Sequence, residues 1–267
     1  MVNVIVMGIA GRMGSRIGAI CNESDVIKIV GGIEKSGHTS VGKDIGIVIG
    51  SGEIGVKVTD SLRDIISSGD VVIDFTHREA TIQNVNVAMS SKKAMVIGTT
   101  GLSKEDMEII KDASRQIPIV QAPNMSVGVN LLLRVLKDIA NVLGDEYDVE
   151  IVELHHRMKK DAPSGTALKM AQVIAESLGR NLDEVGVYAR KGIIGERTKK
   201  EIGIQTVRAG DIVGEHTVYF GGLGERIEIT HKASSRDTFA RGAVRAAQWI
   251  VKQNPGLYDM QDVLGLK

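Results

Sequence analysis

The densest group of reactive side chains lies in one short segment near the middle of the chain. His155 and His156 stand side by side at the end of an apolar run, and Lys159 follows four positions after His155. Ser164-Gly165-Thr166 comes next, where a helix is expected to begin. The N–H groups at a helix start bind anions, and the Thr166 hydroxyl and the nearby cations strengthen that attraction. The segment predicts a pocket for a carboxylate, although a polar loop before an ordinary helix cap has a similar pattern.

The same segment is not expected to bind a metal. Adjacent histidines in an extended strand point to opposite faces, and no H-E-x-x-H spacing occurs in the chain. The single cysteine, Cys21, excludes a disulfide framework and a cysteine-rich zinc site. A single cysteine also fits a reducing compartment, and we expect a cytoplasmic protein with no metal site.

A second pattern with chemical meaning is the glycine-rich turn Gly8-Ile9-Ala10-Gly11-Arg12-Met13-Gly14, which follows the first apolar run. Small residues let the backbone approach a pyrophosphate, and the N–H groups of the following helix start bind it. The spacing is G-x-x-G-x-x-G, which differs from the usual G-x-G-x-x-G. A plain tight turn between a strand and a helix therefore remains the alternative.

The end of the second apolar run strengthens the dinucleotide interpretation. Glu34 lies twenty residues beyond Gly14, where an acid accepts hydrogen bonds from a ribose hydroxyl of NAD. Lys35 could pair with the 2′-phosphate of NADP, so the choice of cofactor stays open. Two later turns, Gly98-Thr99-Thr100-Gly101 and Ala122-Pro123-Asn124-Met125, also follow apolar runs. Ligands collect at the carboxyl ends of such strands, so these turns are candidates for enclosing the nicotinamide ribose and amide, and a plain loop is the alternative for either.

The elements that must position these residues alternate through the first half of the chain. Continuous apolar runs suit strands that are buried on both faces, and we expect strands at residues 2–7, 27–33, 71–75, 94–97 and 117–120. Helices are expected between them at about residues 13–22, 78–90 and 104–116. This alternation predicts a parallel sheet with right-handed crossovers, that is, a Rossmann-type dinucleotide-binding domain.

The pattern changes after about residue 125. Helices are expected at residues 129–143 and 164–178, with a strand between them at 148–154. Three further strands are expected at about residues 201–209, 211–220 and 225–231, with Gly210 and Gly221–Gly224 as hairpin turns. A last helix at 236–252 is expected to return to the first domain. We therefore predict an α/β protein: residues 1–126 with 237–267 form the dinucleotide-binding domain, and 127–236 form an α+β substrate-binding domain with a mixed sheet.

Composition excludes several classes of protein. The 267 residues include 43% hydrophobic residues, which excludes a disordered chain. Thirty-three Lys and Arg balance thirty-three Asp and Glu, so no basic field favours nucleic acid or an anionic membrane. Only 3% of the residues are aromatic, which argues against a stacking platform for single strands. No signal peptide and no membrane-spanning run is expected.

Residues 153–167 are similar to the signature E-x-x-H-x-x-K-x-D-x-P-S-G-T-A of the 4-hydroxy-tetrahydrodipicolinate reductase (dihydrodipicolinate reductase) family. The chain matches this signature at Glu153, His156, Lys159, Asp161, Pro163, Ser164, Gly165, Thr166 and Ala167. Residues 8–14, 98–101, 124–130 and 231–236 also resemble that family's segments, in the same order. The resemblance spans essentially the whole chain.

The resemblance implies a reductase of the diaminopimelate route to lysine, which uses NADH or NADPH to reduce a small cyclic dicarboxylate. It implies that residues 8–13 hold the cofactor pyrophosphate and that Glu34 holds the adenosine ribose. The nicotinamide side would then be lined by two sets of residues, Gly98 to Thr100 and Ala122 to Met125. The resemblance further suggests a homotetramer built through the sheet of the second domain.

The resemblance also assigns roles in the second domain. His155 and Lys159 would be the catalytic pair, with Lys159 the expected proton donor, although the choice between them is left open. His156, Gly165 and Thr166 would bind the substrate carboxylates, and Ser164 belongs to the same expected pocket. Addition of a hydride to a conjugated imine leaves an electron-rich system that needs a proton, which an adjacent ammonium or imidazolium supplies.

Two departures from the family pattern and two alternatives remain. Many relatives have Arg where this chain has Lys35, and Phe where it has Met125. Another two-domain dehydrogenase, acting on a semialdehyde or a sugar, would keep the glycine turn and Glu34 but give residues 159–166 no role. An NAD-sensing regulator would need no catalytic pair. Closure of the two domains predicts hinges near residues 125–129 and 234–238.

Overall fold

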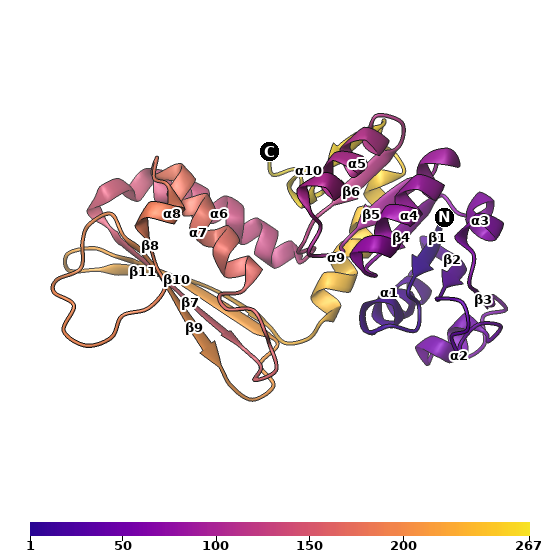
Figure 1. The fold of residues 1–267 in the computed structure, drawn as a ribbon, viewed down its shortest axis with the longest axis horizontal. Coiled ribbons are helices and arrows are strands. Elements are labelled where there is room, and N and C mark those ends of the chain that lie inside the picture. Colours follow the sequence, from indigo (N-terminus) through magenta and orange to yellow (C-terminus); the bar gives the residue numbers. More distant parts are fainter. The chain divides into compact units, whose positions relative to one another are not determined.

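The computed structural model describes all 267 residues, and the chain divides into two compact units. The first unit consists of Met1–Val127 with Arg236–Lys267, and the second consists of Gly128–Ser235. Figure 1 shows that the chain leaves the first unit after β6 and returns to it with α9. Each unit has its own sheet, so the two are described separately.

The first unit contains a seven-stranded parallel sheet with the strand order β12-β6-β5-β4-β1-β2-β3. Its strands are β1 (Val2–Met7), β2 (Ile27–Ile33), β3 (Val58–Thr59), β4 (Val71–Asp74), β5 (Ala94–Ile97), β6 (Pro118–Gln121) and β12 (Gly256–Tyr258). The order reverses between β1 and β4, and such a switch point is where open α/β sheets bind their ligands. The expected Rossmann-type sheet is confirmed.

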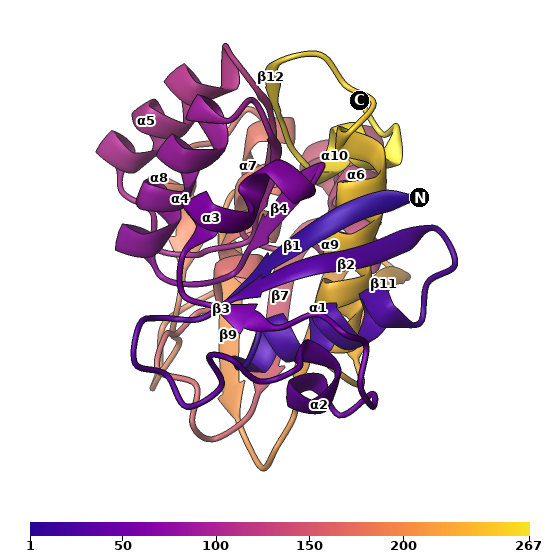
Figure 2. The ribbon, with the colours of Figure 1, turned by 90° about the vertical axis from the view of Figure 1, so that its right-hand side faces the viewer.

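Helices cover both faces of this sheet. They are α1 (Arg12–Asn22), α2 (Ile45–Ile49), α3 (Leu62–Ile65), α4 (Arg78–Ser90), α5 (Lys104–Ser114), α9 (Asp237–Ile250) and α10 (Met260–Leu264), with a 3-10 turn at Ile66–Ser68. One apolar core lies beneath α1 and α9, and another lies beneath α4 and α5. Figure 2 shows these two layers on opposite sides of the strands. Burial on both faces explains why the strands are mostly apolar.

Several short elements of the first unit were not expected. β3 has two residues and β12 has three, and α2, α3 and α10 have four or five each. Elements of this length contain too few residues for a period to be recognised. β12 pairs with β6 and extends the edge of the sheet, so the C-terminal segment also contributes to this domain.

The second unit has a five-stranded mixed sheet with the order β11-β10-β7-β9-β8. Its strands are β7 (Asp148–His155), β8 (Gly186–Val187), β9 (Ile202–Arg208), β10 (Gly214–Gly221) and β11 (Arg226–Ala233). Its helices are α6 (Val127–Leu143), α7 (Gly165–Ser177) and α8 (Leu182–Val185), with a 3-10 turn at Gly144–Glu146. Apolar residues of α6 and α7 form one core with alternate residues of β7, β9 and β10. The mixed sheet is confirmed.

One expected hairpin is wrong. β9 and β10 follow one another around Gly210, but they do not pair: β7 lies between them, parallel to β9 and antiparallel to β10. Gly210 therefore lies in a connection that passes the end of β7, where its carbonyl accepts a hydrogen bond from the Arg157 N–H at 3.1 Å. The second expected hairpin is correct, because β10 pairs with β11 through the turn after Gly221.

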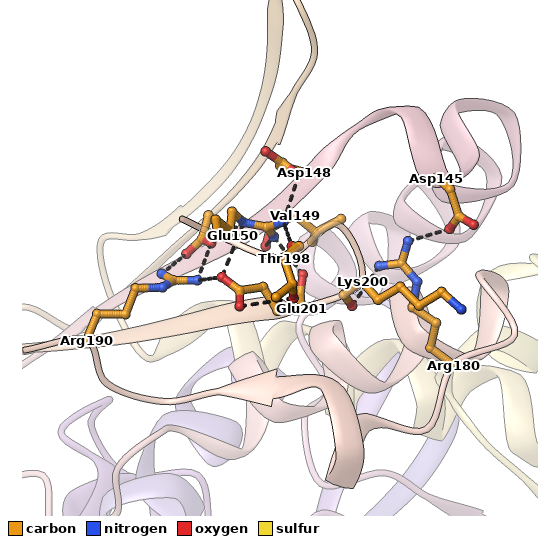
Figure 3. Close-up of polar contacts among 10 residues, drawn as sticks. Asp145, Asp148, Val149, Glu150, Arg180, Arg190, Thr198, Lys200 and Glu201 are labelled. Atoms are coloured by element: carbon orange, nitrogen blue, oxygen red, sulfur yellow. Dashed lines mark hydrogen bonds and ion pairs between the residues drawn. The ribbon is translucent and has the colours of Figure 1, made fainter. Parts of the chain in front are cut away.

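The long connection between β8 and β9 is held to the sheet by ion pairs (Figure 3). Arg190 donates two hydrogen bonds to Glu150 of β7, at 2.7 and 2.9 Å, and one to Glu201 at 2.8 Å. Arg197 donates to Glu150 and to Asp148. These contacts fasten a connection that has no regular secondary structure of its own.

Candidate active site

The glycine turn after β1 is a place where two backbone segments come into very close contact. Gly8 has a φ of +62°, and its carbonyl accepts a hydrogen bond from the Gly11 N–H at 2.8 Å. A Cβ at Gly14 would lie 1.9 Å from the Gly8 carbonyl oxygen, so only glycine fits there. The first turn of α1 therefore sits directly on the end of β1, which leaves backbone N–H groups beside an exposed turn. Within the turn, Ile9 is fully buried, so only its backbone can meet a ligand.

Glu34 is brought to this turn from the end of β2. Its carboxylate accepts a hydrogen bond from the Ala10 N–H at 2.8 Å. Lys35 is exposed directly beside it. The two residues that the sequence analysis assigned to the ribose and to a possible 2′-phosphate thus lie at the same edge of the sheet as the glycine turn.

The turn after β5 is shaped by an aromatic ring. A Cβ at Gly98 would lie 2.2 Å from the ring of Phe75, so this position also needs glycine. Thr99 is buried and its hydroxyl lies 2.7 Å from that of Thr81, whereas Thr100 is exposed. The backbone of residues 98–100 and the Thr100 side chain are the parts that can meet a ligand.

A buried carboxylate, which the sequence analysis missed, organises the neighbouring turn after β4. Asp74 accepts hydrogen bonds from the Thr76 N–H at 2.8 Å, from the Thr76 hydroxyl at 2.6 Å and from the Asn84 amide at 2.8 Å. The available signal was an aspartate that ends the otherwise apolar run of residues 71–74. Asp74 thereby fixes the backbone that leads to Phe75.

The turn after β6 packs against α9. A Cβ at Gly242 would lie 1.7 Å from the Met125 carbonyl oxygen, and the Ser126 hydroxyl lies 3.0 Å from that of Thr238. Asn124 accepts a hydrogen bond from the Ser126 N–H at 2.9 Å. The Met125 side chain is buried in the core, so this residue can offer a ligand only its backbone. Pro123, next to the buried Ala122, is exposed at this edge.

The second unit gathers its polar residues around one buried carboxylate. Glu153, on β7, is fully buried and accepts hydrogen bonds from both terminal nitrogens of Arg208, at 2.8 and 2.9 Å. It also accepts one from the Ser164 N–H at 3.0 Å, and it contacts Nδ1 of His155. Burial raises the pKa of Glu153, but the hydrogen bonds from Arg208 and His155 outweigh it, so its pKa lies below the ordinary value.

His155 lies between this carboxylate and a second buried histidine. Its ring meets the ring of His216 edge to face, with the centroids 5.2 Å apart. Burial lowers the pKa of His155 and outweighs the opposite effect of Glu153. Burial, with the nearby His155, lowers the pKa of His216 to about 4. Both imidazoles are therefore neutral at pH 7.

Ser164 is the N-cap of α7, and its side chain is occupied by structural contacts. Its hydroxyl accepts a hydrogen bond from the Ala167 N–H at 3.1 Å and lies 3.0 Å from Nε2 of His216. Gly165 follows it and is exposed, and a Cβ there would meet nothing within 4 Å. The open space beside the start of α7, where a carboxylate was expected, therefore lies at Gly165 and the neighbouring Thr166. Ser164 is buried, and its side chain supports the helix start.

Lys159 lies in the turn between β7 and α7. Its ammonium donates to both oxygens of Asp161, at 2.8 and 2.9 Å, and the hydrogen bond lowers the pKa of Asp161. The Asp161 carbonyl accepts a hydrogen bond from Arg208 at 2.6 Å, which links this turn to Glu153. His156 directly follows the end of β7, and its buried Nδ1 has no hydrogen-bond partner in the chain.

Glu153 was predicted only as part of the family signature, and Arg208 and His216 were not predicted at all. Arg208 reaches Glu153 from β9, and His216 reaches Ser164 from β10. Their distance along the chain hides this association, because nothing in the local pattern around residues 208 and 216 indicates a partner on β7.

No group of three or more His, Cys, Asp or Glu side chains has an arrangement that could hold a metal ion. None of the helices combines the length and apolar character needed to cross a lipid bilayer.

A Rossmann-type sheet with a glycine turn and an acid at the end of β2, followed by a mixed-sheet unit rich in cations, defines a two-domain oxidoreductase that uses a nicotinamide cofactor. Comparison with known families makes this specific. The models described as "Dihydrodipicolinate reductase, N-terminus" and "Dihydrodipicolinate reductase, C-terminus" match residues 2–125 and 128–264. The chain belongs to the dihydrodipicolinate reductase family.

Relatives with this name match the chain from end to end. The 4-hydroxy-tetrahydrodipicolinate reductases of Syntrophus aciditrophicus and Syntrophobacter fumaroxidans are 58% and 57% identical to it, over 100% of each chain. Among solved structures, the dipicolinate-bound dihydrodipicolinate reductase of Paenisporosarcina sp. TG-14 shares its fold, with a TM-score of 0.76, 23% identity and 98% coverage of both chains. The resemblance stated from the sequence is thus confirmed.

Proposed function

We propose that this protein reduces 4-hydroxy-tetrahydrodipicolinate to tetrahydrodipicolinate with NADH or NADPH, in the diaminopimelate route to lysine. The observation that carries the proposal is the full-length identity of 58% to a reductase of that name. The residues around Glu153 support it further, because they combine a lysine, two histidines and a helix start within one unit. These groups suit a small anionic substrate that must receive a proton.

The first unit binds the cofactor, which supplies the hydride when bound. Glycine is required at residues 14 and 98, where a Cβ would lie 1.9 and 2.2 Å from other atoms. That close packing keeps the edge of the sheet free of side chains, as a dinucleotide needs. Backbone groups of residues 8–13 hold the pyrophosphate and Glu34 holds the adenosine ribose. Residues 98–100 and 122–125 line the nicotinamide side.

The second unit binds the substrate and delivers the proton. Gly165 and Thr166 at the start of α7, with His156, bind the substrate carboxylates. Lys159 is the proton donor, because its side chain is an ammonium that remains partly exposed, with a side-chain exposure of 20%. His155 is buried, and its lowered pKa leaves it neutral at pH 7, so it acts beside Lys159 as a hydrogen-bonding group.

The choice between cofactors and the oligomeric state are part of the same proposal. The carboxylate of Glu34 favours a free ribose hydroxyl, whereas the exposed Lys35 favours a 2′-phosphate, so both cofactors are accepted.

A homotetramer forms through the sheet of the second unit. The face of β7 and β10 opposite α6 and α7 is only half-buried in the isolated chain, which supports this arrangement.

The test is a coupled assay with purified protein. The preceding synthase generates the substrate from pyruvate and aspartate semialdehyde, and NADH absorbance is followed. We expect NADH to be consumed only when this protein and the synthase product are both present. Folded protein that binds NADH but consumes none of it under these conditions would refute the proposed activity.

A further inference from the structure

Glu153 is the most completely buried charged group of the second unit, and it lies outside the roles proposed above. Its side chain has no exposure to solvent, and its carboxylate contacts Arg208, Ser164 and His155. The Thr206 hydroxyl donates a further hydrogen bond at 3.3 Å. A buried carboxylate requires this number of donors, because an unpaired charge in the interior costs several kcal/mol.

Each partner of Glu153 leads to a different part of the proposed active site. Ser164 is the N-cap of α7, so its N–H connects the carboxylate to the helix start that binds the substrate. Arg208 connects it to the Asp161 carbonyl, and Asp161 holds the ammonium of Lys159. His155 is connected directly through Nδ1. One carboxylate therefore links the proton donor, its histidine neighbour and the substrate helix.

Stability by itself does not call for this arrangement. Replacement of a buried ion pair by apolar residues of similar volume is often neutral or stabilising. A second carboxylate of β7, Glu150, pairs with Arg190 (Figure 3) and with Arg197. Its hydrogen bonds go to these two arginines, and none goes to a histidine or to α7. The feature that separates Glu153 from Glu150 is its contact with the reacting part of the molecule.

We propose that Glu153 is a positioning residue for the reduction. It holds His155 in the tautomer that carries its proton on Nδ1, and it keeps the Lys159 turn and the start of α7 in one fixed geometry through Arg208 and Ser164. A neutral imidazole that donates from Nδ1 to a carboxylate has its Nε2 lone pair available. The inference rests on the proposed function for its kinetic test, but its tautomer test is independent of turnover.

The kinetic test compares Glu153→Gln with Glu150→Gln. Both changes remove one Arg-paired carboxylate from the same strand and preserve its shape. We expect Glu153→Gln to lower kcat by about 10- to 100-fold, by analogy with the loss when the carboxylate partner of a metal-binding histidine is removed. The dissociation constant for NADH should not change, because the cofactor residues lie in the first unit. Glu150→Gln, compared with wild type in the same oligomeric state by size-exclusion chromatography, should keep kcat within about twofold of wild type. Equal kcat for the two variants would overturn the proposal.

The second test reads the tautomer of His155 directly in the wild-type protein. Long-range proton–nitrogen correlation spectra at pH 7.5 should show His155 protonated on Nδ1, and His155→Gln identifies its signals. Protonation on Nε2 in the wild type would overturn the proposal even if Glu153→Gln fails to fold. If the wild-type protein shows no turnover, the proposed function is refuted. The tautomer of His155 would still show whether its Nδ1 donates a hydrogen bond to Glu153.

Discussion

The contact between the glycine turn and α1 makes a sharp prediction for Gly14→Ala. The added Cβ would lie 1.9 Å from the Gly8 carbonyl oxygen and 2.6 Å from its carbon, both of which are backbone atoms. No rotamer change can relieve such an overlap, so the helix start must move by roughly 1 Å. The N–H groups that we assign to the cofactor pyrophosphate move with it.

The magnitude follows from two opposing effects. Overpacking in a well-packed interior costs about 1–3 kcal/mol, and a backbone overlap belongs at the upper end of that range. Alanine in place of glycine within a helix returns about 1 kcal/mol. We therefore expect a net loss of about 2 kcal/mol in the free energy of unfolding, which lowers Tm by about 4–8 °C in a chain of this size. Loss of one hydrogen bond to a charged phosphate, about 1.5–3 kcal/mol, weakens NADH binding at least tenfold.

The same helix contains a matched control. A Cβ at Gly18 would lie 2.9 Å from Cδ1 of Ile9 and 3.1 Å from Cγ2 of Ile49. These are side-chain atoms that can move, so Gly18→Ala should keep its Tm within a few degrees and bind NADH as tightly as wild type. Thermal unfolding and titration of NADH fluorescence measure both quantities. Folded Gly14→Ala with wild-type affinity for NADH would refute our account of the glycine turn.

Three further changes have definite expected outcomes. Lys159→Ala should lower kcat by orders of magnitude while NADH binding survives; lost NADH binding would instead place Lys159 in the cofactor site. Lys35→Ala should weaken binding of NADPH more than that of NADH, and equal effects in the two titrations would remove its role toward the 2′-phosphate. His216 has a pKa of about 4 in the folded protein, below the ordinary 6.5, so the unfolded chain binds more protons between these values and stability falls as the pH drops through this range. The loss attributable to His216 should reach about 1.4 kcal/mol per pH unit. Denaturant titrations at several pH values measure how the free energy of unfolding depends on pH. This dependence should be weaker in His216→Gln and unchanged when the exposed His77 is substituted. An unchanged pH dependence in His216→Gln would contradict the assigned burial effect.

Local pattern was sufficient for much of the first unit. The strands at residues 2–7, 27–33 and 94–97 are mostly apolar because helices cover both faces of the sheet, so the residue types themselves indicate the burial. The glycine turn could be recognised for the same kind of reason, since close backbone contact excludes every other residue. Elements as short as β3 and β12 could not be predicted, because two or three residues show no period and only their neighbours hold them.

In the second unit, the sequence could indicate the strands but not their order. The strands expected at residues 201–209 and 211–220 were predicted to pair around Gly210, yet β7 lies between the observed strands β9 and β10. The choice of partner depends on which arrangement buries the alternate apolar residues against α6 and α7, and no local pattern records it. The expected hairpin at Gly221 was correct, because β10 pairs directly with β11 through the turn that follows Gly221.

The sequence by itself therefore indicated the family, the class of cofactor and the segment that we propose to react, because a helix start, a glycine turn and the signature from Glu153 to Ala167 are contiguous stretches of chain. Only the tertiary structure decided what surrounds those residues. Arg208 and His216 stand 55 and 52 residues from the groups that they contact, Glu153 and Ser164. Such contacts arise from strand register and from the need to pair a buried charge, and both are set only when the sheet has formed.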